Sequence, residues 1–316
     1  MSGEDLQKPS VLVVGAGAIG AFYGSVLARQ GVRVAVVCRS DYEAVRRDGF
    51  AISSAKLGEY VFRPERVLRH VAEYTPAPDY LILAVKVIEG EDRVELIRPA
   101  VGPSTTIVLI ENGIDIEPEI AGAFPENDVL SCLAFVASGR VGPGRISHQS
   151  YGYLMLGKFP EGVTPAAERL GALWEAGGVP CQVVGNVVAA RWQKAVWNAV
   201  FNPISIMGGV LTTAEMLSSP TAEDLVRRAM QEVCAVAAAC GHPPPADLID
   251  GYIPNTRAMP PYKTSMALDY EHRRPMEVEA IVGNVVRAGQ RAGVPIPTLE
   301  AIYAITKMIE HKARHR

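Results

Sequence analysis

A narrow stripe of polar side chains in residues 191–202 has the residue types and spacing of a reactive site. The segment reads RWQKAVWNAVFN, and a 3.6-residue period gives it one polar face and one apolar face. The ammonium and carboxamide groups of the polar face form a donor set that can hold and protonate a developing alkoxide. A solvated helix face explains the same pattern. Pro203 is expected to end the helix. The stripe consists of Arg191, Lys194, Asn198 and Asn202.

A glycine-rich turn follows the first apolar run of the chain. Residues 10–20 read SVLVVGAGAIG, so GxGxxG stands between an expected buried strand and an expected helix from Ile19 to Gln30. The three glycines permit a tight turn, close approach of the backbone to a pyrophosphate, and close packing of helix on strand. The pattern therefore predicts a bound dinucleotide. The expected cofactor contacts in this turn are Gly15, Ala16, Gly17, Ala18, Ile19 and Gly20.

The end of the second expected strand indicates which dinucleotide is bound. After VRVAVV the chain reads CRS, which places Arg39 in or next to the position that usually carries an acid for the adenosine ribose. A guanidinium group favours a 2′-phosphate instead. An exposed Arg that opens the next loop is the alternative. Because no acid precedes Asp41, we expect the cofactor to be NADPH/NADP+.

Two later apolar runs deliver polar side chains to one edge of the expected sheet. DYLILAVKV (79–87) carries Lys86 near its C-terminal end. TTIVLIENG (105–113) carries Asn112 and Gly113 in the same place. Open α/β sheets bind ligands at this edge, so we expect a rim for nicotinamide and substrate. A solubilising lysine and an ordinary Asn-Gly turn are the alternatives.

The order of the segments predicts an α/β fold with two domains. Residues 50–63 alternate around a glycine and are expected to form a hairpin, and residues 129–157 are expected to form antiparallel strands. We predict an N-terminal Rossmann-type doubly wound sheet in residues 1–185 and a second, all-helical C-terminal domain in residues 186–316. Within the second domain, the proline-rich stretch 242–261 is expected to be a long irregular connection.

Composition excludes several classes of function. The 316 residues are 48% hydrophobic and 21% charged, a composition typical of a globular protein. The net charge of −3 gives no positive electrostatic field to attract nucleic acid. Five cysteines without CxxC spacing and six scattered histidines predict neither disulfides nor a metal site. No apolar run approaches the roughly 20 residues of a membrane span, and the first ten residues lack a signal pattern. We expect a cytoplasmic protein without nucleic-acid, membrane or metal partners.

Together these motifs resemble the ketopantoate reductases, also called 2-dehydropantoate 2-reductases. The resemblance rests on GAGAIG, the strand-end Lys86, ENG, KAVWNAVFNP, TSMALD and RRPMEVEAIVGNVV, and it spans nearly the whole chain. Its most specific part is Lys-x3-Asn-x3-Asn-Pro, followed later by Ser265 and Glu277. The family has a further Asn shortly after the Asn-Pro, where this chain reads GGVLTT. Thr212 or a neighbouring residue is the expected substitute.

The resemblance implies NADPH-dependent reduction of 2-dehydropantoate to pantoate, a step of pantothenate and coenzyme A biosynthesis. It implies that Lys194 is the general acid, with a pKa lowered by burial near other cations. It also implies that Lys86 and Asn112 contact the cofactor, and that Glu277 accepts a hydrogen bond from a substrate hydroxyl. The substrate-binding residues that it implies are Asn112, Asn198, Asn202, Ser265 and Glu277.

Two other functions fit the same residues. A reductase of another 2-oxo acid, or a 3-hydroxyacid-type dehydrogenase, would share the glycines and the Lys-x3-Asn spacing. A non-catalytic NADP(H)-sensing protein would need only residues 1–185 and would leave the polar stripe without a purpose. We expect a small-molecule 2-oxo acid as the substrate and keep a homodimer as an assembly to test.

Overall fold

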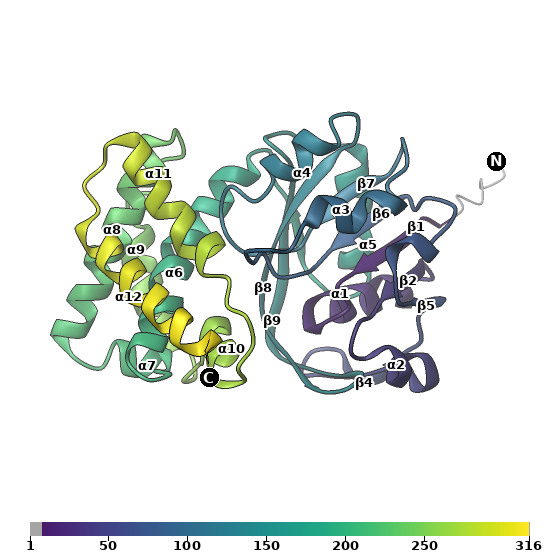
Figure 1. Cartoon of the computed structure of the whole chain (residues 1–316), viewed down its shortest axis with the longest axis horizontal. Coiled ribbons are helices and arrows are strands. Elements are labelled where there is room, and N and C mark those ends of the chain that lie inside the picture. The colour runs from purple at the N-terminus through teal and green to yellow at the C-terminus, as the bar shows by residue number, and fades with distance from the viewer. Residues whose placement is uncertain (1–7, 316) are drawn as a thin grey trace. The chain divides into compact units, whose positions relative to one another are not determined.

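The computed structural model describes residues 8–315, which divide into two compact units. Figure 1 labels the elements of both units. Two short segments that follow strands of the first unit belong to the second by their contacts. Unit 1 comprises the described residues through Val85, together with Asp92–Glu111 and Glu117–Val187. Unit 2 comprises Lys86–Glu91, Asn112–Ile116 and the chain from Val188 onward.

Unit 1 is built on a mixed β-sheet. Its strands are β1 (Ser10–Val14), β2 (Arg33–Val37), β3 (Phe50–Ser54), β4 (Gly58–Phe62), β5 (Arg66–Leu68), β6 (Tyr80–Leu83), β7 (Thr106–Leu109), β8 (Val129–Gly142), β9 (Arg145–Lys158) and β10 (Cys181–Val183). The order is β4-β3-β9-β8-β7-β6-β1-β2-β5, with β10 beside β9. Neighbours from β5 through to β8 are parallel, which is the Rossmann strand order. The chain order reverses between β1 and β6, where such sheets bind ligands.

Helices cover both faces of this sheet, as the sequence predicts. Alternate side chains of β1 point to opposite faces because a strand has a period of two. Val11 and Val13 lie in one core with α1 (Ala18–Arg29) and α5 (Pro165–Ala176). Leu12 and Val14 lie in a second core with α3 (Arg93–Ile97) and α4 (Pro118–Ala123). The doubly wound Rossmann-type domain is therefore confirmed.

The two predicted antiparallel features are present at the far side of the sheet. β3 and β4 form the expected hairpin, in which Phe50 pairs with Phe62. β8 and β9 form the expected antiparallel ribbon, which carries three register irregularities. A short helix, α2 (Tyr42–Asp48), stands between β2 and the hairpin. None of the five cysteines is in a disulfide.

Unit 2 is helical. Its elements are α6 (Val187–Met207), α7 (Thr213–Met216), α8 (Pro220–Ala239), α9 (Leu248–Ala258), α10 (Ser265–Glu271), the π-helical turn η3 (Glu279–Gly283), α11 (Asn284–Ala292) and α12 (Pro297–Arg314). The apolar face of α6 enters a core shared with α8 and α12, in which Val196, Val200 and Phe201 are fully buried. Within residues 8–315, no helix is long and apolar enough to cross a bilayer.

Pro203 lies inside α6, so the expectation that it ends the helix is wrong. The helix continues to Met207. Proline removes one backbone donor, but side chains beside it bond helix carbonyls. Asn202 Nδ2 donates to Asn198 O at 3.0 Å, and Ser205 Oγ donates to Asn202 O at 2.6 Å. Burial of the apolar residues on both sides of the proline outweighs the lost hydrogen bond.

The proline-rich stretch 242–261 is not irregular throughout, because α9 occupies its middle. Ile253 is buried in the unit 2 core. Trp197 Nε1 donates to Thr256 Oγ1 at 3.0 Å, and Tyr252 OH donates to Gln193 O at 3.1 Å. These contacts with α6 stabilise a helix that local composition argues against.

A buried histidine joins α1, β3 and β9 within unit 1. His148 is 2% exposed, and its ring lies 4.3 Å from that of Phe22. Its Nδ1 is 2.8 Å from Ser54 Oγ, and its Nε2 is 3.2 Å from Ser150 O. A neutral ring satisfies both contacts, with Nε2–H donating to the carbonyl and Nδ1 accepting from the hydroxyl. Burial lowers the pKa of His148 below its ordinary value.

This lowered pKa predicts a loss of stability in mild acid. The unfolded chain binds a proton at this residue near pH 6.5, whereas the native chain does so at lower pH, so stability falls as pH drops below about 6.5. We expect His148→Gln to lose less unfolding free energy between pH 7 and pH 5 than the unmodified protein. Thermal unfolding across this range measures the difference. The matched change at exposed His70 should follow the unmodified protein, and equal slopes for both variants would contradict the assignment.

Candidate functional site

The glycine turn after β1 has the shape that a pyrophosphate requires. Gly15 has φ +91°, and a Cβ there would lie 2.7 Å from Ala84 O. A Cβ on exposed Gly17 would meet nothing within 4 Å, so the backbone is open at this point. A Cβ on Gly20 would lie 2.5 Å from Gly15 O. The three positions thus provide a tight turn, open access and close helix packing, as a dinucleotide site needs.

The N-terminus of α1 also favours an anion at this turn. No side chain caps the helix, and its first turn holds no acidic residue. Uncapped N–H groups and the helix dipole favour an anion. Ala16 is buried beneath the turn, while Ala18 and Ile19 are half-buried beside it. The six residues that the sequence predicts for the pyrophosphate therefore form the turn after β1 and the first turn of α1, at the point where the strand order reverses.

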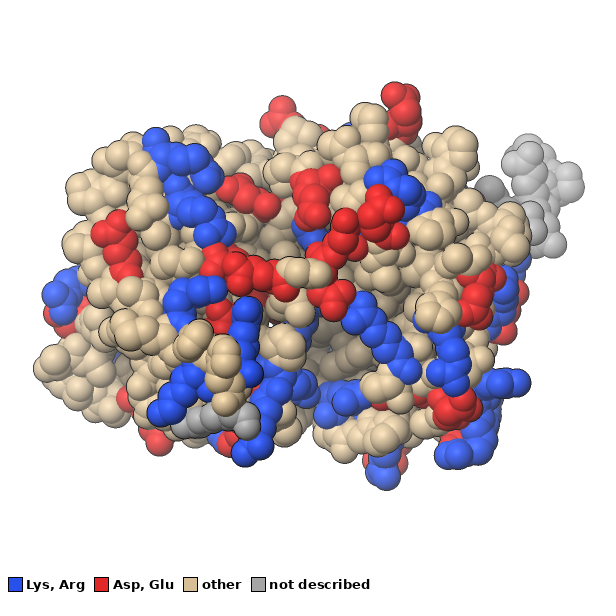
Figure 2. Space-filling view, in the orientation of Figure 1, with Lys and Arg blue, Asp and Glu red and all other residues tan. Residues whose placement is uncertain are grey.

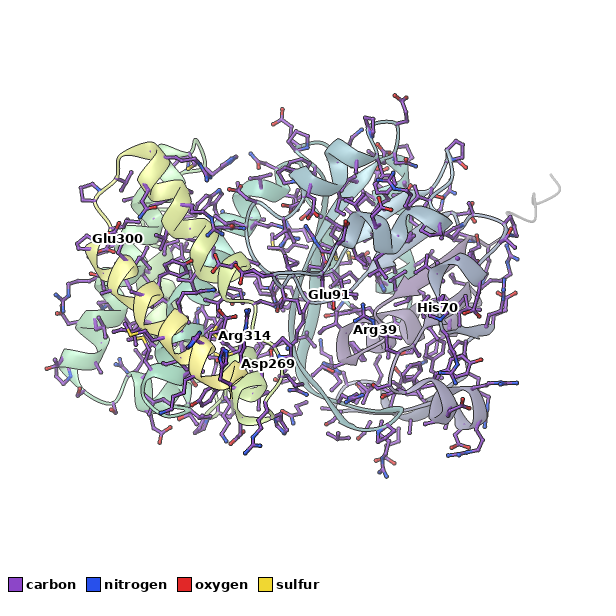
Figure 3. The ribbon with its side chains drawn as sticks, viewed as in Figure 1. Arg39, His70, Glu91, Asp269, Glu300 and Arg314 are labelled. Atoms are coloured by element: carbon purple, nitrogen blue, oxygen red, sulfur yellow. The ribbon has the colours of Figure 1, made fainter. Side chains whose placement is uncertain are left out.

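Arg39, which Figure 3 labels, follows β2 and is exposed. Strands β1 and β2 are parallel neighbours, so their C-terminal ends lie at the same sheet edge. A second guanidinium reaches the same loop, since Arg140 Nη1 donates to Ser40 Oγ at 2.9 Å. The sequence gives no signal for Arg140, which lies near the end of β8, 100 residues from Ser40.

In unit 2, the lysine of the polar stripe is hydrogen-bonded to the predicted rim residue. Lys194 Nζ donates to Asn112 Oδ1 at 2.9 Å. The segment that carries Asn112 is fixed to the helices by two further bonds. Arg191 Nη1 donates to Gly113 O at 3.0 Å, and Asn284 Nδ2 donates to Ile114 O at 2.7 Å. The segment thus delivers Asn112 to α6.

Gly113 allows this segment to lie directly on the π-helical turn. It has φ +105°, and a Cβ there would lie 2.5 Å from Ala280 O. The next residue donates to the same carbonyl, with Ile114 N 3.2 Å from Ala280 O. The ENG sequence is therefore more than an ordinary turn, because only glycine permits both the backbone conformation and the close approach. π-helical turns are frequent at functional sites.

Lys86 is held within unit 2 by two oxygen atoms. Its Nζ donates to Pro275 O at 2.6 Å and pairs with Asp269 Oδ2 at 2.6 Å. Asp269, which Figure 3 labels on α10, also pairs with Arg274 Nε at 3.0 Å. Sequence reasoning missed Asp269, although it is the last residue of the TSMALD motif. Its carboxylate fixes the direction of the Lys86 side chain.

Glu277 lies beside these groups and is buried. Its Oε1 accepts from Val87 N at 3.0 Å. Burial raises the pKa of Glu277 above its ordinary value, and the charge of Asp269 raises it further. The bond from Val87, the charge of Lys86 and a hydrogen bond with Asn112 act in the opposite direction without cancelling the rise. Burial thus disfavours the charged form of this carboxyl group.

The remaining predicted residues lie where α6 meets α10. Asn202 is 1% exposed, and its Oδ1 accepts from Ser265 Oγ at 3.3 Å and from Met266 N at 3.2 Å. Ser265 is exposed, and Asn198 is half-buried one turn before Asn202. The expected substitute Thr212 caps α7, with Oγ1 donating to Glu215 Oε2 at 2.7 Å. Its hydroxyl is therefore used by the helix cap.

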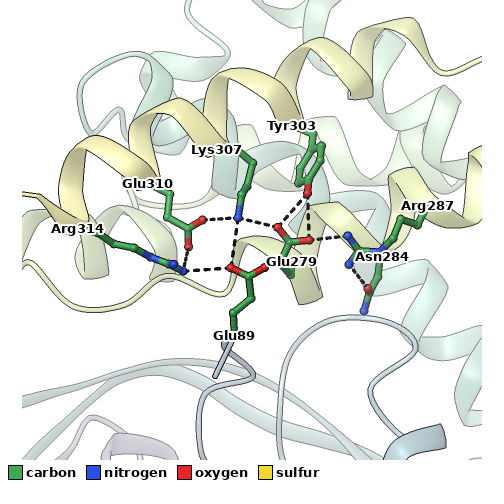
Figure 4. Close-up of polar contacts among 8 residues, drawn as sticks. All are labelled: Glu89, Glu279, Asn284, Arg287, Tyr303, Lys307, Glu310 and Arg314. Atoms are coloured by element: carbon green, nitrogen blue, oxygen red, sulfur yellow. Dashed lines mark hydrogen bonds and ion pairs between the residues drawn. The ribbon is translucent and has the colours of Figure 1, made fainter. Parts of the chain in front are cut away.

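A charged network supports this cluster from the surface of unit 2 (Figure 4). Glu279 in η3 accepts from Arg287 Nη1 at 2.6 Å, from Tyr303 OH at 2.9 Å and from Lys307 Nζ at 2.8 Å. Glu89, which follows Lys86 in the chain, lies 3.6 Å from Lys307 Nζ. The network thus links both the segment after β6 and the π-helical turn to α12.

The visible surface carries mixed charge. Figure 2 shows both acidic and basic side chains on that face. Among residues 8–315, no group of three or more His, Cys, Asp or Glu side chains is placed to hold a metal ion.

Two family models match the chain and together cover most of it. The model described as Ketopantoate reductase PanE/ApbA matches residues 11–161, and Ketopantoate reductase PanE/ApbA C terminal matches residues 186–310. The chain belongs to the ketopantoate reductase family. It is therefore an oxidoreductase of the 2-dehydropantoate 2-reductase type, which acts on CH–OH donors.

Individual relatives agree with this family. A 2-dehydropantoate 2-reductase of Nostoc sp. (strain PCC 7120) is 31% identical over 307 residues, with 96% of this chain and 95% of the relative covered. A crystal structure of 2-dehydropantoate 2-reductase from Methylococcus capsulatus is 53% identical, has a TM-score of 0.91, and covers 96% of this chain and 97% of its own. D-mandelate dehydrogenase solved with NADH and anilino(oxo)acetate is 22% identical with a TM-score of 0.86, covering 96% of this chain and 99% of its own, and shows a shared fold.

The raised pKa of Glu277 predicts that this residue costs stability. Its native carboxyl binds a proton at higher pH than it does in the unfolded chain, so its contribution to stability falls as pH rises from about 4.5 through the native pKa. We expect Glu277→Gln to raise unfolding free energy at pH 8 by roughly 0.5 to 2 kcal/mol, and by less at pH 4.5. Denaturant unfolding at both pH values measures this. Exposed Glu271→Gln is the control, and a variant destabilised at pH 8 would contradict the expectation.

Proposed function

We propose that this ketopantoate reductase uses NADPH to reduce 2-dehydropantoate to pantoate, a cytoplasmic step of pantothenate and coenzyme A biosynthesis. The observation that carries the proposal is the bond from Lys194 to Asn112, next to buried Glu277. It combines a proton donor, an amide that orients it, and an acceptor for a substrate hydroxyl in one unit. The names of the relatives supply the substrate class.

The residues of unit 1 fit the cofactor. The open backbone at Gly17 and the uncapped N-terminus of α1 would hold its pyrophosphate, and Arg39 would bind the 2′-phosphate. Bound NADPH supplies a hydride for the C2 carbonyl of the substrate. In unit 2, Lys86 is assigned to the nicotinamide ribose by the family resemblance, and Asp269 fixes the direction of its ammonium group.

Lys194 is assigned the proton transfer. Its ammonium group would turn from Asn112 Oδ1 to the substrate carbonyl oxygen, stabilise the negative charge as it develops, and donate the proton that makes the alcohol. Asn112 would keep the ammonium in place before the substrate arrives. This role requires the carbonyl oxygen to lie within hydrogen-bond reach of Nζ.

The other groups would orient the substrate. The exposed Ser265 hydroxyl would donate to the substrate carboxylate, and the Asn198 amide would contact the same molecule. Asn202 would act chiefly by fixing Ser265, because its amide is already bonded to α10 and to the backbone of α6. Glu277 would accept a hydrogen bond from the C4 hydroxyl.

A different 2-oxo acid is the alternative substrate. The engagement of Thr212 in a helix cap favours it, since the family's additional Asn then has no replacement at that position. Assays of NADPH oxidation with 2-dehydropantoate and a panel of 2-oxo acids test substrate and activity together. Light scattering in the same buffers tests the proposed homodimer.

Lys194→Ala should lower kcat about 10²- to 10⁴-fold, since it removes a group that acts chiefly in the transition state. The Kd for NADPH should change little. Steady-state kinetics and fluorescence titration measure the two quantities. Lys312→Ala, an exposed change on α12, controls for lost charge. A near-normal kcat in Lys194→Ala would contradict the proposed proton transfer and favour the alternative interpretation of the stripe as a solvated helix face.

Glu277→Gln should impair reduction of 2-dehydropantoate more than that of a branched 2-oxo acid without the C4 hydroxyl. Only the first substrate loses a charge-assisted contact, and the difference in kcat/KM should be roughly tenfold or more. Parallel assays of both substrates measure it. Equal decreases in kcat/KM for the two substrates would indicate a role at the reacting carbonyl or in holding the fold. An unchanged kcat/KM for both substrates would show that Glu277 does not contact the substrate.

A further inference from the structure

The β8–β9 turn is bonded to the loop that follows β2. Arg140, near the end of β8, donates through Nη1 to Ser40 Oγ at 2.9 Å and forms an ion pair with Asp41. The second carboxylate oxygen of Asp41 accepts from Gly144 N at 3.0 Å. These contacts, all within unit 1, place a guanidinium from a distant part of the sequence next to the residue after Arg39.

The Arg140 guanidinium is held in place and still accessible. The Asp41 side chain is 7% exposed, so its carboxylate is a fixed anchor, whereas the Arg140 side chain is 40% exposed. A guanidinium has five N–H donors arranged as a fork, and the contacts with Ser40 and Asp41 use Nη1. The Nε and Nη2 donors are left over for a ligand on a side chain that is partly exposed.

A third arginine near this loop is used differently. Arg69 lies over the Tyr42 ring, with its guanidinium carbon 3.9 Å from the ring centroid, and it pairs with Glu43. Both of these partners belong to α2. Arg69 therefore stabilises that helix, whereas Arg140 is directed to the loop that carries Arg39.

We propose that Arg140 is a second residue that determines cofactor specificity, binding the 2′-phosphate of NADP(H) together with Arg39. The inference rests on the proposed use of NADPH. Asp41 pairs with Arg140 and fixes its guanidinium next to the loop that carries Arg39. Two forks can bind different oxygens of the same phosphate, which a single arginine does less selectively. Asp41 is the positioning residue for Arg140.

The test compares two ligands that differ by the 2′-phosphate alone. Isothermal titration with 2′,5′-ADP and with 5′-AMP gives the ratio of their Kd values for the unmodified protein, Arg140→Gln and Arg140→Lys. We expect Arg140→Gln to weaken 2′,5′-ADP roughly tenfold to hundredfold and to leave 5′-AMP unchanged. The Kd of Arg140→Lys for 2′,5′-ADP should lie between the values for the unmodified protein and Arg140→Gln, because lysine keeps the charge but has no planar fork of donors.

Arg145→Gln is the matched control. Arg145 opens β9 at the same turn and is exposed, so this change removes the same charge from the same place. Its ratio should equal that of the unmodified protein. Thermal unfolding checks that each variant is folded. If Arg140→Gln does not fold, the comparison is made with Arg140→Lys.

The outcomes separate this inference from the choice of NADPH. An unmodified protein that binds the two ligands equally would overturn both. A clear preference that Arg140→Gln retains would overturn the role of Arg140 and leave NADPH standing. Equal losses in Arg140→Gln and Arg145→Gln would also overturn it, because the effect would then be general electrostatics. A loss confined to Arg140 supports the inference.

Discussion

The close approach of Gly113 to Ala280 is the constraint on which the contact between Asn112 and Lys194 depends. A side chain at position 113 would collide with a backbone carbonyl, which cannot move without disturbing the π-helical turn. With glycine there, Ile114 N bonds Ala280 O and Asn112 comes within hydrogen-bond distance of Lys194. The absence of a Cβ at position 113 therefore allows the hydrogen bond between Asn112 and Lys194, the proposed proton donor.

Electrostatics in the cluster is a balance of opposed charges rather than a single strong field. The buried Glu277 carboxyl has a cation, Lys86, and an anion, Asp269, as neighbours, and the same two groups also pair with each other. Burial is the largest of these influences and raises the pKa of Glu277, while Lys86 lowers it and Asp269 raises it.

The sequence predicts features that depend on local pattern and misses those that depend on distant packing. The glycine turn, the Rossmann order and the strand-end positions of Lys86 and Asn112 follow from short motifs and from strand geometry. The expected helix end at Pro203 and the expected irregular stretch 242–261 are wrong, because helix propensity is weaker than core packing. Asp269 and Arg140 have no signal in the sequence, because Lys86 and Asp41, with which they pair, lie far away along the chain. The assigned roles of the site residues stay predictions.

The polar stripe of α6 shows how one periodic pattern serves two purposes. Its outer members are almost fully buried, since Arg191 is 4% exposed and Asn202 is 1% exposed. Both bond protein groups, Arg191 the Gly113 carbonyl and Asn202 the start of α10. Lys194 and Asn198 lie between them and are half-buried. A period of 3.6 can place four side chains on one face, but burial decides which of them hold the scaffold and which can meet a substrate. We infer that Arg191 and Asn202 hold the neighbouring segments in place, and that Lys194 and Asn198 are the pair available to a substrate.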